Sequence, residues 1–349
     1  MSSSTIKDVA RVAGVGVATA SRALSGHGPV SEDTAMRVRA AAAQLGYRPS
    51  SIARALTLQR SGAIGVYVPA FDGYFYSGIV STVDGVLRAA GRHMVAANGC
   101  GDASARQQAQ DGIDFLIDRD CDGLLVACHS LLDEDLDAML RRRPGSVVVN
   151  RVVPGHEERC FTGDHVLGGT LVARALISHG HREIAVVRGP RHAPDNEARM
   201  RGFDQALARH GLAVRPEHGV DAAFDQASGD EAARRLLDSA PRRRGRLRPA
   251  FTAIFAANDV MAMAVISRLT QSGLRVPQDI SVIGYDDADF AAHLAPPLTT
   301  LRMPTARVAA SACRHVLNLC YGMDLPVARD FTPAVVWRQS VAPGPHPPA

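Results

Sequence analysis

Residues 5–24, TIKDVARVAGVGVATASRAL, decide the fold of the N-terminal part of the chain. In the first half of this stretch the apolar residues recur with helical spacing, and Thr5 stands three residues before Asp8, as in a capping box. Gly14 follows, where a left-handed backbone is needed to end a helix. The pattern predicts a short helix that begins after Thr5 and ends at Gly14.

The second half of the stretch predicts another short helix, over residues 17–24, with small side chains and one long cation, Arg22. Two short helices joined by a tight turn are typical of a helix-turn-helix, whose second helix enters the DNA major groove. Ser31 can begin a third helix that runs to Leu45 and closes a small core. Many helical pairs of this size never touch nucleic acid, so the motif alone leaves DNA binding open.

Positive charge is concentrated in this N-terminal part. Residues 1–60 contain eight Lys or Arg and three Asp or Glu, a net charge of +5, whereas the whole chain carries +4. The rest of the chain is therefore slightly acidic. A basic helical module is what contact with DNA phosphates requires, so the charge distribution favours DNA binding.

The composition predicts a globular protein without a membrane segment. The first ten residues lack the apolar run of a signal peptide, and no stretch of about 18 apolar residues is present. The six cysteines show neither Cys-x-x-Cys nor a Cys/His spacing typical of metal sites. We therefore expect a cytoplasmic protein with reduced thiols, no metal, no cofactor and no membrane partner.

From residue 63 onward, apolar strands alternate with amphipathic helices. A first series runs from a strand at 64–68 to a strand at 147–149, and a second from a helix after Asp164 to a strand at 280–284. Such alternation predicts parallel, doubly wound sheets with helices on both faces. Two series of this length predict two lobes, with a ligand between them at the carboxyl ends of the strands.

Three segments lie outside this alternation. Residues 49–58, PSSIARALTL, have helical spacing but are too short to persist alone, so they form a linker or a helix that needs a partner. The basic run at 242–248 is expected to be an exposed loop rather than a second nucleic-acid site. The proline-rich residues 342–349 are expected to be a disordered tail without a coiled coil.

Motifs spread along the chain point to one family. They are Thr5-Ile-Lys-Asp-Val-Ala10, Ala13-Gly-Val15, Thr19 and Ser21-Arg22, then Tyr47-x-Pro49 and Ala53-x-x-Leu56, and finally Ile280-Ser-Val-Ile-Gly-Tyr-Asp-Asp287 and Pro297-Leu-Thr-Thr300. With these motifs the chain resembles the lactose/galactose repressor family over nearly its whole length. The stretch 150–160 is most similar to the galactose repressor branch. Gly16 and Ala20 depart from the family's usual serine cap and larger apolar residue.

The resemblance implies an α/β protein with a small all-α headpiece. The helix-turn-helix headpiece would cover residues 1–48 and a hinge helix residues 49–61. A two-lobed core similar to periplasmic binding proteins, with doubly wound parallel sheets, would cover residues 62–341. Its first lobe is expected at about 62–162 plus 296–325, and its second at about 163–295 plus 326–341.

On the DNA side, the resemblance implies that Val17 and Ala18 face base edges and that Arg22 reaches a guanine. The chemistry agrees, since the arginine fork matches the O6 and N7 acceptors of guanine. Leu56 is implied to wedge into the minor groove at a central base step; packing within the linker is its alternative role. The other residues implied at the DNA surface are Thr5, Thr19, Ser21, Ser31, Tyr47, Ser50, Ala53 and Arg54.

In the core, the resemblance implies an effector site with Arg199, its partner carboxylate Asp286, and Asn258. A guanidinium fork, a carboxylate and an amide supply the paired donors and acceptors that sugar hydroxyls need. The other implied residues are Phe224 as a flat face for a pyranose ring, Asn150 where the lactose repressor has a carboxylate, and Tyr74 and Phe75. A role in the core or in a surface ion pair is the alternative for each.

The sequence therefore predicts a ligand-responsive homodimeric repressor that binds a palindromic operator in double-stranded DNA and is released by a sugar, with galactose as the first candidate. The alternatives are a regulator of the same family that responds to another sugar or a nucleoside, and a sugar receptor without a DNA role. No glycine-rich phosphate loop or nucleophile motif is present, so we expect no enzyme and no catalytic residues.

Overall fold

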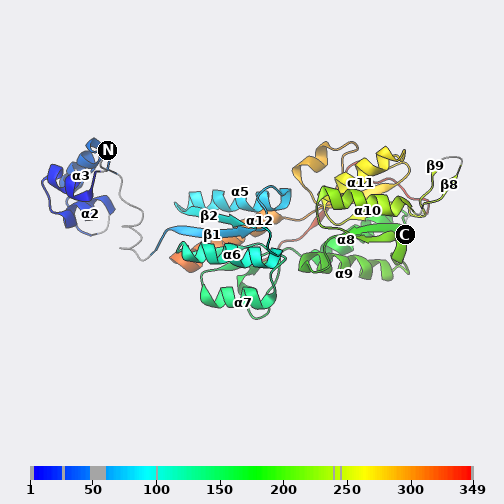
Figure 1. Cartoon of the computed structure of the whole chain (residues 1–349), viewed down its shortest axis with the longest axis horizontal. Helices are drawn as coiled ribbons and strands as arrows, with labels where there is room; N and C mark the ends of the chain where they lie inside the picture. Colours follow the sequence, from blue (N-terminus) through cyan, green and yellow to red (C-terminus); the bar gives the residue numbers. More distant parts are fainter. Residues whose placement is uncertain are drawn as a thin grey trace. The chain divides into compact units, whose positions relative to one another are not determined.

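The computed structural model describes residues 4–25, 28–47, 60–99, 101–238, 240–243 and 246–346. These residues form two compact units, a small N-terminal one and a large one that contains nearly everything after residue 63. Most of the predicted hinge, up to residue 59, lies outside the described residues. Figure 1 labels the helices and strands that are used below.

Three helices build the small unit: α1 (Ile6–Ala13), α2 (Val17–Ser25) and α3 (Glu32–Gln44). The backbone N–H of Thr5 donates to Asp8 Oδ2 at 3.0 Å, which is the return bond of a capping box. Gly14 has a left-handed φ of +66° after α1, and the Ser31 hydroxyl caps α3. The helices and caps predicted from residues 5–45 are confirmed.

The core of the small unit is built mostly from alanine. Because alanine side chains are short, the three helices pack around little apolar area, and two valines are the largest of the buried side chains. Ala20, where the resembled family has a larger apolar residue, is itself fully buried in this core. The buried set is Val9, Ala10, Ala13, Ala20, Ala23, Val38, Ala41 and Ala42.

The first lobe of the large unit is a five-stranded sheet in the order β2-β1-β3-β4-β5. The pairs β1/β3, β3/β4 and β4/β5 are parallel, and Figure 1 shows α5 on one face of the sheet and α6 and α7 on the other. The strands are β1 (Ala63–Val68), β2 (His93–Asn98), β3 (Gly123–Val126), β4 (Val147–Val149) and β5 (Cys160–Phe161). The helices are α5 (Tyr74–Ala89), α6 (Ala105–Asp118), α7 (Asp133–Arg142) and the short η1 (Glu157–Arg159).

The second lobe is a six-stranded sheet in the order β13-β12-β11-β10-β6-β7. All its pairs are parallel except β12/β13, which is antiparallel. The strands are β6 (Ile184–Arg188), β7 (Gly219–Asp221), β10 (Ala253–Ala256), β11 (Ser281–Asp286), β12 (Thr299–Arg302) and β13 (Ala334–Val336). The helices are α8 (His165–Ser178), α9 (Pro194–Ala208), α10 (Gln226–Asp238) and α11 (Asp259–Gln271), with η2 (Pro216–His218) and η3 (Asp289–His293).

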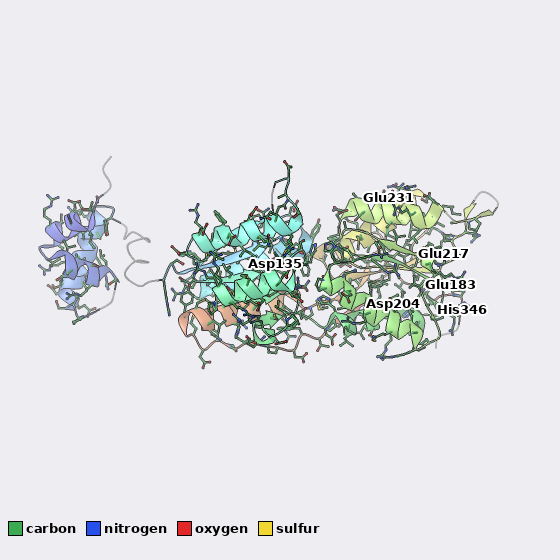
Figure 2. The ribbon with its side chains drawn as sticks, turned by 60° about the horizontal axis from the view of Figure 1, so that its bottom comes forward. Asp135, Glu183, Asp204, Glu217, Glu231 and His346 are labelled. Carbon is green, nitrogen blue, oxygen red and sulfur yellow. The ribbon has the colours of Figure 1, made fainter. Side chains whose placement is uncertain are left out.

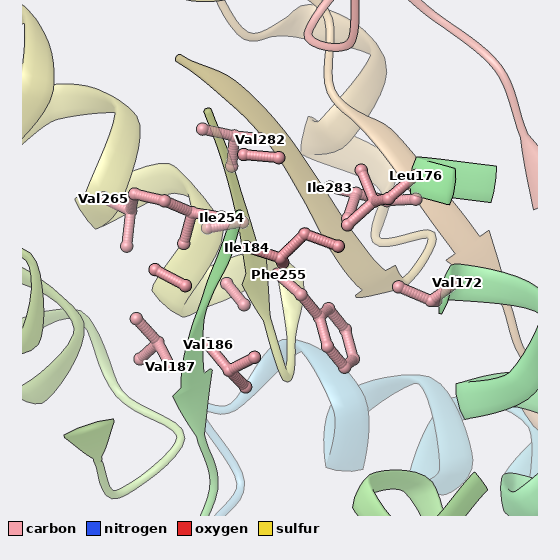
Figure 3. Packing of buried hydrophobic residues seen from close by; sticks show 14 of the residues in the cluster. Val172, Leu176, Ile184, Val186, Val187, Ile254, Phe255, Val265, Val282 and Ile283 are labelled. Carbon is pink, nitrogen blue, oxygen red and sulfur yellow. The ribbon is translucent and has the colours of Figure 1, made fainter. Parts of the chain in front are cut away.

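Helices cover both faces of this second sheet, as the strand–helix alternation predicts. Figure 3 shows Val265 of α11 beside Ile254 on one face and Leu176 of α8 beside Ile283 on the other. Successive residues of a strand point to opposite faces, so a strand covered on both sides must be apolar throughout. That requirement explains the continuous apolar runs in β6, β10 and β11.

The predicted lobe boundaries near residues 296 and 326 are wrong. Strand β12 pairs with β11 in the second lobe, although residues 296–302 were assigned to the first. Helix α12 (Thr305–Tyr321) packs with α5 in the first-lobe core, and Phe331 belongs to the same cluster. The antiparallel β13 then returns the chain to the second lobe. Strand β12 has the sequence Thr-Thr-Leu-Arg, which contains no apolar run, so the local pattern does not predict a strand there.

Two further expectations need correction. The basic run after residue 241 contains an antiparallel pair, β8 (Arg242–Arg243) and β9 (Arg246–Leu247), rather than a loop, and Leu247 packs against the second-lobe core. Residues 342–346 are ordered, because the Gly344 and His346 N–H groups donate to the carbonyls of His179 and Gly180. Figure 2 shows His346 at the end of the second lobe that also carries Glu183 and Glu217.

Among the described helices, none is long and apolar enough to cross a membrane.

Candidate ligand cleft and nucleic-acid interface

A cleft between the two lobes of the large unit gathers the predicted effector residues. Its volume is about 930 Å³, and ends of strands and helices from both lobes line it. This is where doubly wound sheets bind ligands, outside the carboxyl ends of the strands. The structure brings all seven predicted residues to its wall: Tyr74, Phe75, Asn150, Arg199, Phe224, Asn258 and Asp286.

Arg199 is buried on α9 and held from three directions. Its Nη1 donates to the Ala257 carbonyl, and its Nη2 lies 3.4 Å from Asp195 Oδ2. The central carbon of the guanidinium is 3.6 Å from the centroid of the Tyr285 ring, within the range of a cation–π contact. Within the described part of the chain, Nε has no hydrogen-bond partner. Arg199 is therefore fixed in place, and these two bonds leave other N–H groups of its guanidinium unused.

Asp195 is a site residue that sequence reasoning missed. Asp286 was expected to be the carboxylate partner of Arg199, but the ion pair that the structure contains is Arg199–Asp195. The two residues are four apart on α9, the spacing at which charged side chains meet along a helix. That spacing is the signal in the sequence that could have identified Asp195.

The two aspartates at the end of β11 have different surroundings. Both have left-handed backbones, with φ of +110° at Asp286 and +61° at Asp287. The Asp287 carboxylate lies 2.6 Å from Arg302 and 2.6 Å from Arg338, so it ties β11 to β12 and to the C-terminal segment. The structure gives the carboxyl of Asp286 neither a hydrogen bond nor an ion pair with any described residue, and Asp286 lines the cleft.

The environment of Asp286 favours its neutral form. Loss of contact with bulk water raises the pKa of this carboxyl well above its usual value, although the nearby Arg199 opposes the shift. A neutral carboxyl donates through one oxygen and accepts through the other. Asp286 therefore suits a ligand hydroxyl, which also donates and accepts.

Asn258 is used mainly inside the protein. It caps α11, where its Oδ1 accepts from the Met261 N–H at 2.8 Å, and its Nδ2 donates to the Phe224 carbonyl at 2.9 Å. One N–H of the amide remains for a ligand, so Asn258 offers the cleft a single donor and not a full amide. The cap also explains why an asparagine is favoured at this position.

Phe224 is held in an unusual backbone conformation beside a glycine. Its φ is +68°, and a Cβ on Gly189 would come within 2.2 Å of its ring. The ring therefore fits only because residue 189 has no side chain. The Arg199 guanidinium carbon lies 5.7 Å from the ring centroid, so the aromatic face and the buried cation share one side of the cleft.

Asp259 is a second acidic residue of the cleft that sequence reasoning did not identify. It is 1% exposed, and it accepts hydrogen bonds from Thr300 Oγ1 at 2.5 Å and from the Ala288 N–H at 2.8 Å. Burial raises the pKa of its carboxyl to about 7, although both hydrogen bonds oppose the shift. A Cβ on Gly284 would lie 2.1 Å from Asp259 Oδ1, so the carboxyl needs glycine there.

A buried histidine joins the two lobes. His165, the first residue of α8, lies with Nε2 2.9 Å from Asn150 Oδ1 in the first lobe and Nδ1 3.0 Å from the Tyr285 hydroxyl in the second. Burial, with a further contribution from the charge of Arg199, lowers the pKa of His165 to about 4. The sequence carried no signal for this role beyond the position of His165 at the start of a helix.

The two aromatic residues predicted on the first lobe differ in exposure and packing. Tyr74 is 52% exposed, and its ring meets Phe290 of the second lobe at a centroid distance of 4.6 Å. Phe75 packs edge-on against Tyr76 at 5.2 Å and against the first-lobe core. Tyr74 is thus free to contact a ligand in the cleft, whereas the packing of Phe75 favours its alternative role in the core.

In the small unit, α2 has one exposed face and one buried face. Val17, Ala18, Ser21 and Arg22 are exposed, while Ala20 and Ala23 on the other side are buried in the core. A helix that packs through one face and offers small residues and an arginine on the other can enter a major groove. Thr19 is half-buried between the two faces.

The other predicted DNA residues are less uniform. The Thr5 hydroxyl donates to Asp8, the Ser31 hydroxyl donates to Thr34 Oγ1 at 2.9 Å, and Tyr47 packs against the small core. These contacts give each of the three a structural role in the headpiece. Four predicted residues lie outside the described residues: Ser50, Ala53, Arg54 and Leu56.

No group of three or more His, Cys, Asp or Glu residues in the described ranges is arranged to hold a metal ion. Burial raises the pKa of the Cys128, Cys160 and Cys313 thiols, which keeps them in the unreactive protonated form.

Sequence profiles of two known families match the chain. The profile of the bacterial regulatory proteins of the lacI family matches residues 5–50, and that of a periplasmic binding protein-like domain matches residues 173–341. Among characterised relatives, the HTH-type transcriptional regulator GalS of Salmonella typhimurium is 36% identical over 339 residues, which cover 97% of this chain and 96% of GalS.

Two solved structures are similar over almost the full length. The lac repressor dimer bound to operator and the anti-inducer ONPF superposes with a TM-score of 0.85 at 26% identity, covering 98% of this chain and 100% of that one. A complex of the transcriptional regulator CelR with cellobiose superposes with a TM-score of 0.68 at 30% identity, covering 97% of this chain and 99% of that one.

Proposed function

The chain belongs to the lacI family of bacterial regulatory proteins, and we propose that it is a homodimeric repressor that a sugar of the galactose type releases from a palindromic operator. As a member of this family it is a DNA-binding regulator of transcription and not an enzyme. The finer statements, on the ligand, the dimer and the operator, form the proposal. The operator would be reached in the cytoplasm.

The arrangement of polar groups around Arg199 is the observation that carries the effector assignment. A sugar hydroxyl both donates and accepts, and the cleft is lined by the guanidinium of Arg199 and by the carboxyl of Asp286, which has no protein partner among the described residues. The aromatic faces of Phe224 and Tyr74 suit the apolar side of a pyranose ring. CelR, a relative with the same fold, is bound to cellobiose.

Galactose is the first candidate because the stretch 150–160 is most similar to the galactose repressor branch and because GalS is among the relatives. Another sugar or a nucleoside is the alternative within the same family. A sugar receptor without a DNA role is the second alternative; the exposed face of α2 and the positive charge of residues 1–60 argue against it.

Release from DNA would follow from the two-lobed architecture. A ligand that contacts both walls of the cleft binds one arrangement of the lobes more tightly than the other, and only this difference in affinity can shift the equilibrium. The two headpieces of a dimer would then no longer have the spacing and orientation that the two half-sites of a palindrome require. The lac repressor dimer bound to its operator supports this mode of binding.

A thermal-shift panel of sugars and nucleosides on the full chain tests the effector. D-galactose is expected to raise the melting temperature, since a ligand that binds only the folded state stabilises it by mass action. Arg199→Met should abolish the shift, whereas Arg201→Met, a matched change at an exposed position of the same helix, should keep it. A shift that survives Arg199→Met would place the ligand elsewhere.

Duplexes selected from a random pool by the wild-type chain test the DNA assignment. Arg22→Ala should lose at least about tenfold in affinity for the selected duplex at matched salt, because a bidentate arginine–guanine contact contributes about 1–3 kcal/mol of discrimination. Arg39→Ala removes the same charge from exposed α3 and should weaken selected and random duplexes equally. Undiminished preference for the selected duplex in Arg22→Ala would contradict the assignment.

A further inference from the structure

We propose that His165 is a positioning residue that holds the amide oxygen of Asn150, so that this residue presents only N–H donors to the effector. The effector would therefore place a hydrogen-bond acceptor against Asn150. The inference rests on the proposed function, because it concerns the same cleft and names the chemistry that one of its subsites selects.

The geometry of His165 permits two hydrogen-bond patterns. A neutral imidazole carries one N–H, and both ring nitrogens have a partner at 2.9–3.0 Å. In the first pattern the Tyr285 hydroxyl donates to Nδ1, and Nε2–H donates to Asn150 Oδ1. In the second pattern Nδ1–H donates to the Tyr285 oxygen, and the Asn150 amide is turned so that its nitrogen donates to Nε2.

Arg199 selects the first pattern. Its guanidinium lies over the Tyr285 ring and also acts as a hydrogen-bond donor toward the Tyr285 hydroxyl, which opposes the rise that burial causes in the pKa of the phenol. An N–H that points at the phenol oxygen leaves the hydroxyl hydrogen to point elsewhere. The hydrogen then points to His165 Nδ1, which must accept it. The low pKa of His165 keeps the ring neutral, and the raised pKa of Tyr285 keeps the hydroxyl protonated.

The surrounding backbone keeps these three side chains in place. A Cβ on Gly168 would lie 2.3 Å from the Tyr285 hydroxyl oxygen, so a glycine three residues after His165 provides the room for the phenol. Asn150 has a left-handed φ of +69°, and its own N–H donates to the Phe161 carbonyl at 2.7 Å. The backbone of Asn150 and its side-chain oxygen are therefore both held in place.

What remains of Asn150 for a ligand is the NH2 group. Its nitrogen has no hydrogen-bond partner among the described residues, and Asn150 lines the cleft. The Asn150 NH2 group is then a vacant donor in the cleft that Arg199 also lines. Ether, carbonyl and hydroxyl oxygens can accept from it, whereas a group that only donates cannot. An aspartate at position 150 would reverse this selection, because its second oxygen only accepts.

The tautomer of His165 gives the first test. In full-length chain labelled with 15N-histidine, the resonance lost in His165→Gln identifies this ring among the 13 histidines. We expect a neutral ring protonated at Nε2 at pH 7, with no protonation of Nδ1 down to about pH 5, given a pKa of about 4. A ring protonated at Nδ1 would overturn the proposal, whatever ligand the cleft binds.

Selectivity among galactose derivatives gives the second test. Each hydroxyl of D-galactose is replaced in turn by fluorine, which accepts weakly and cannot donate, or by hydrogen, which does neither. At one position we expect the fluoro sugar to bind wild type at least about threefold more tightly than the deoxy sugar, the size of a modest hydrogen bond. Asn150→Asp should remove or reverse this preference at that same position.

A matched control separates this role from general destabilisation. His181 is another buried histidine with two partners, Thr252 Oγ1 at 2.9 Å and the Ala342 carbonyl at 3.0 Å, and it does not line the cleft. His181→Gln should leave the fluoro/deoxy ratio unchanged, whereas His165→Gln should change it. An equal ratio in wild type, His165→Gln and Asn150→Asp at every position would overturn the proposal. If no galactose derivative binds wild type, the proposed effector fails, and the tautomer alone decides the role of His165.

Discussion

Replacing Asp259 by Asn should change how the free energy of unfolding depends on pH. The pKa of Asp259 is about 7 in the folded chain, against 3.8 for the free side chain. The folded state therefore holds a proton that the unfolded state has lost, so this residue adds stability as the pH falls from 7 toward 4. With 1.36 kcal/mol for each pKa unit, the gain between pH 7.5 and pH 4.5 is about 3 kcal/mol.

His165 should contribute with the opposite sign over the same range. Its pKa is about 4 in the folded chain, against 6.5 for the free side chain, so the unfolded state gains a proton first and stability is lost as the pH falls from 6.5 toward 4. The loss between pH 7.5 and pH 4.5 is about 2.5 kcal/mol. In wild type the gain from Asp259 and the loss from His165 nearly cancel. In Asp259→Asn only the loss from His165 should remain, and in His165→Gln only the gain from Asp259.

Urea unfolding at several pH values, followed by circular dichroism and by the fluorescence of Trp337, measures this difference. The free energy of unfolding of wild type minus that of Asp259→Asn should grow by about 3 kcal/mol between pH 7.5 and pH 4.5. The same difference for His165→Gln should fall by about 2.5 kcal/mol. If the free energy of unfolding of each variant changes with pH in parallel with that of wild type, the reasoning is refuted. In that case neither Asp259 nor His165 would titrate differently in the folded and the unfolded chain.

Two packing substitutions should affect separate parts of the chain. In urea unfolding, Gly169→Ala should lower the stability of the large unit by about 2–3 kcal/mol, since its Cβ would lie 1.9 Å from the Arg199 carbonyl oxygen. Gly85→Ala on α5 is the control: its Cβ would have nothing within 4 Å, and it should raise the stability by about 0.5–1 kcal/mol. Val38→Ala should destabilise the headpiece by about 2 kcal/mol, because the buried valine is one of two in an alanine core; a headpiece melting transition that does not move would contradict this.

The fold could be predicted from the sequence wherever one local pattern decided an element. The caps at Thr5 and Ser31 and the apolar runs of β6 and β10 need only neighbouring residues, and the structure places helices and strands there. Strand β12, with the sequence Thr-Thr-Leu-Arg, has no apolar run, and its role comes from pairing with β11. Pairing between distant segments leaves little local pattern, so the lobe boundaries were predicted wrongly.

The residues of the candidate site also fall into those that a local motif identifies and those whose role depends on distant partners. Residues that stand in recognisable motifs, such as Arg199 and Asp286, could be assigned to the cleft from the sequence. His165 could not, because its role depends on Asn150 and Tyr285, which lie 15 and 120 residues away. Asn258 was assigned to the ligand, but its amide is mostly used by the cap of α11. A residue type reveals which hydrogen bonds are possible, and only the fold shows which are already made.

Helices α8 and α9 link the junction of the lobes to Arg199, the arginine of the proposed effector site. Helix α8 begins at His165, which bonds to the first lobe, and α9 carries Arg199. The two helices meet backbone to backbone at Gly169 and Gly202, where an added Cβ would lie 1.9 Å from a carbonyl oxygen of the opposite helix. Helices in such close contact resist sliding past each other. If the proposed effector displaces Arg199, we therefore expect His165 and its bond to Asn150 to move with it, through a glycine contact that does not line the cleft.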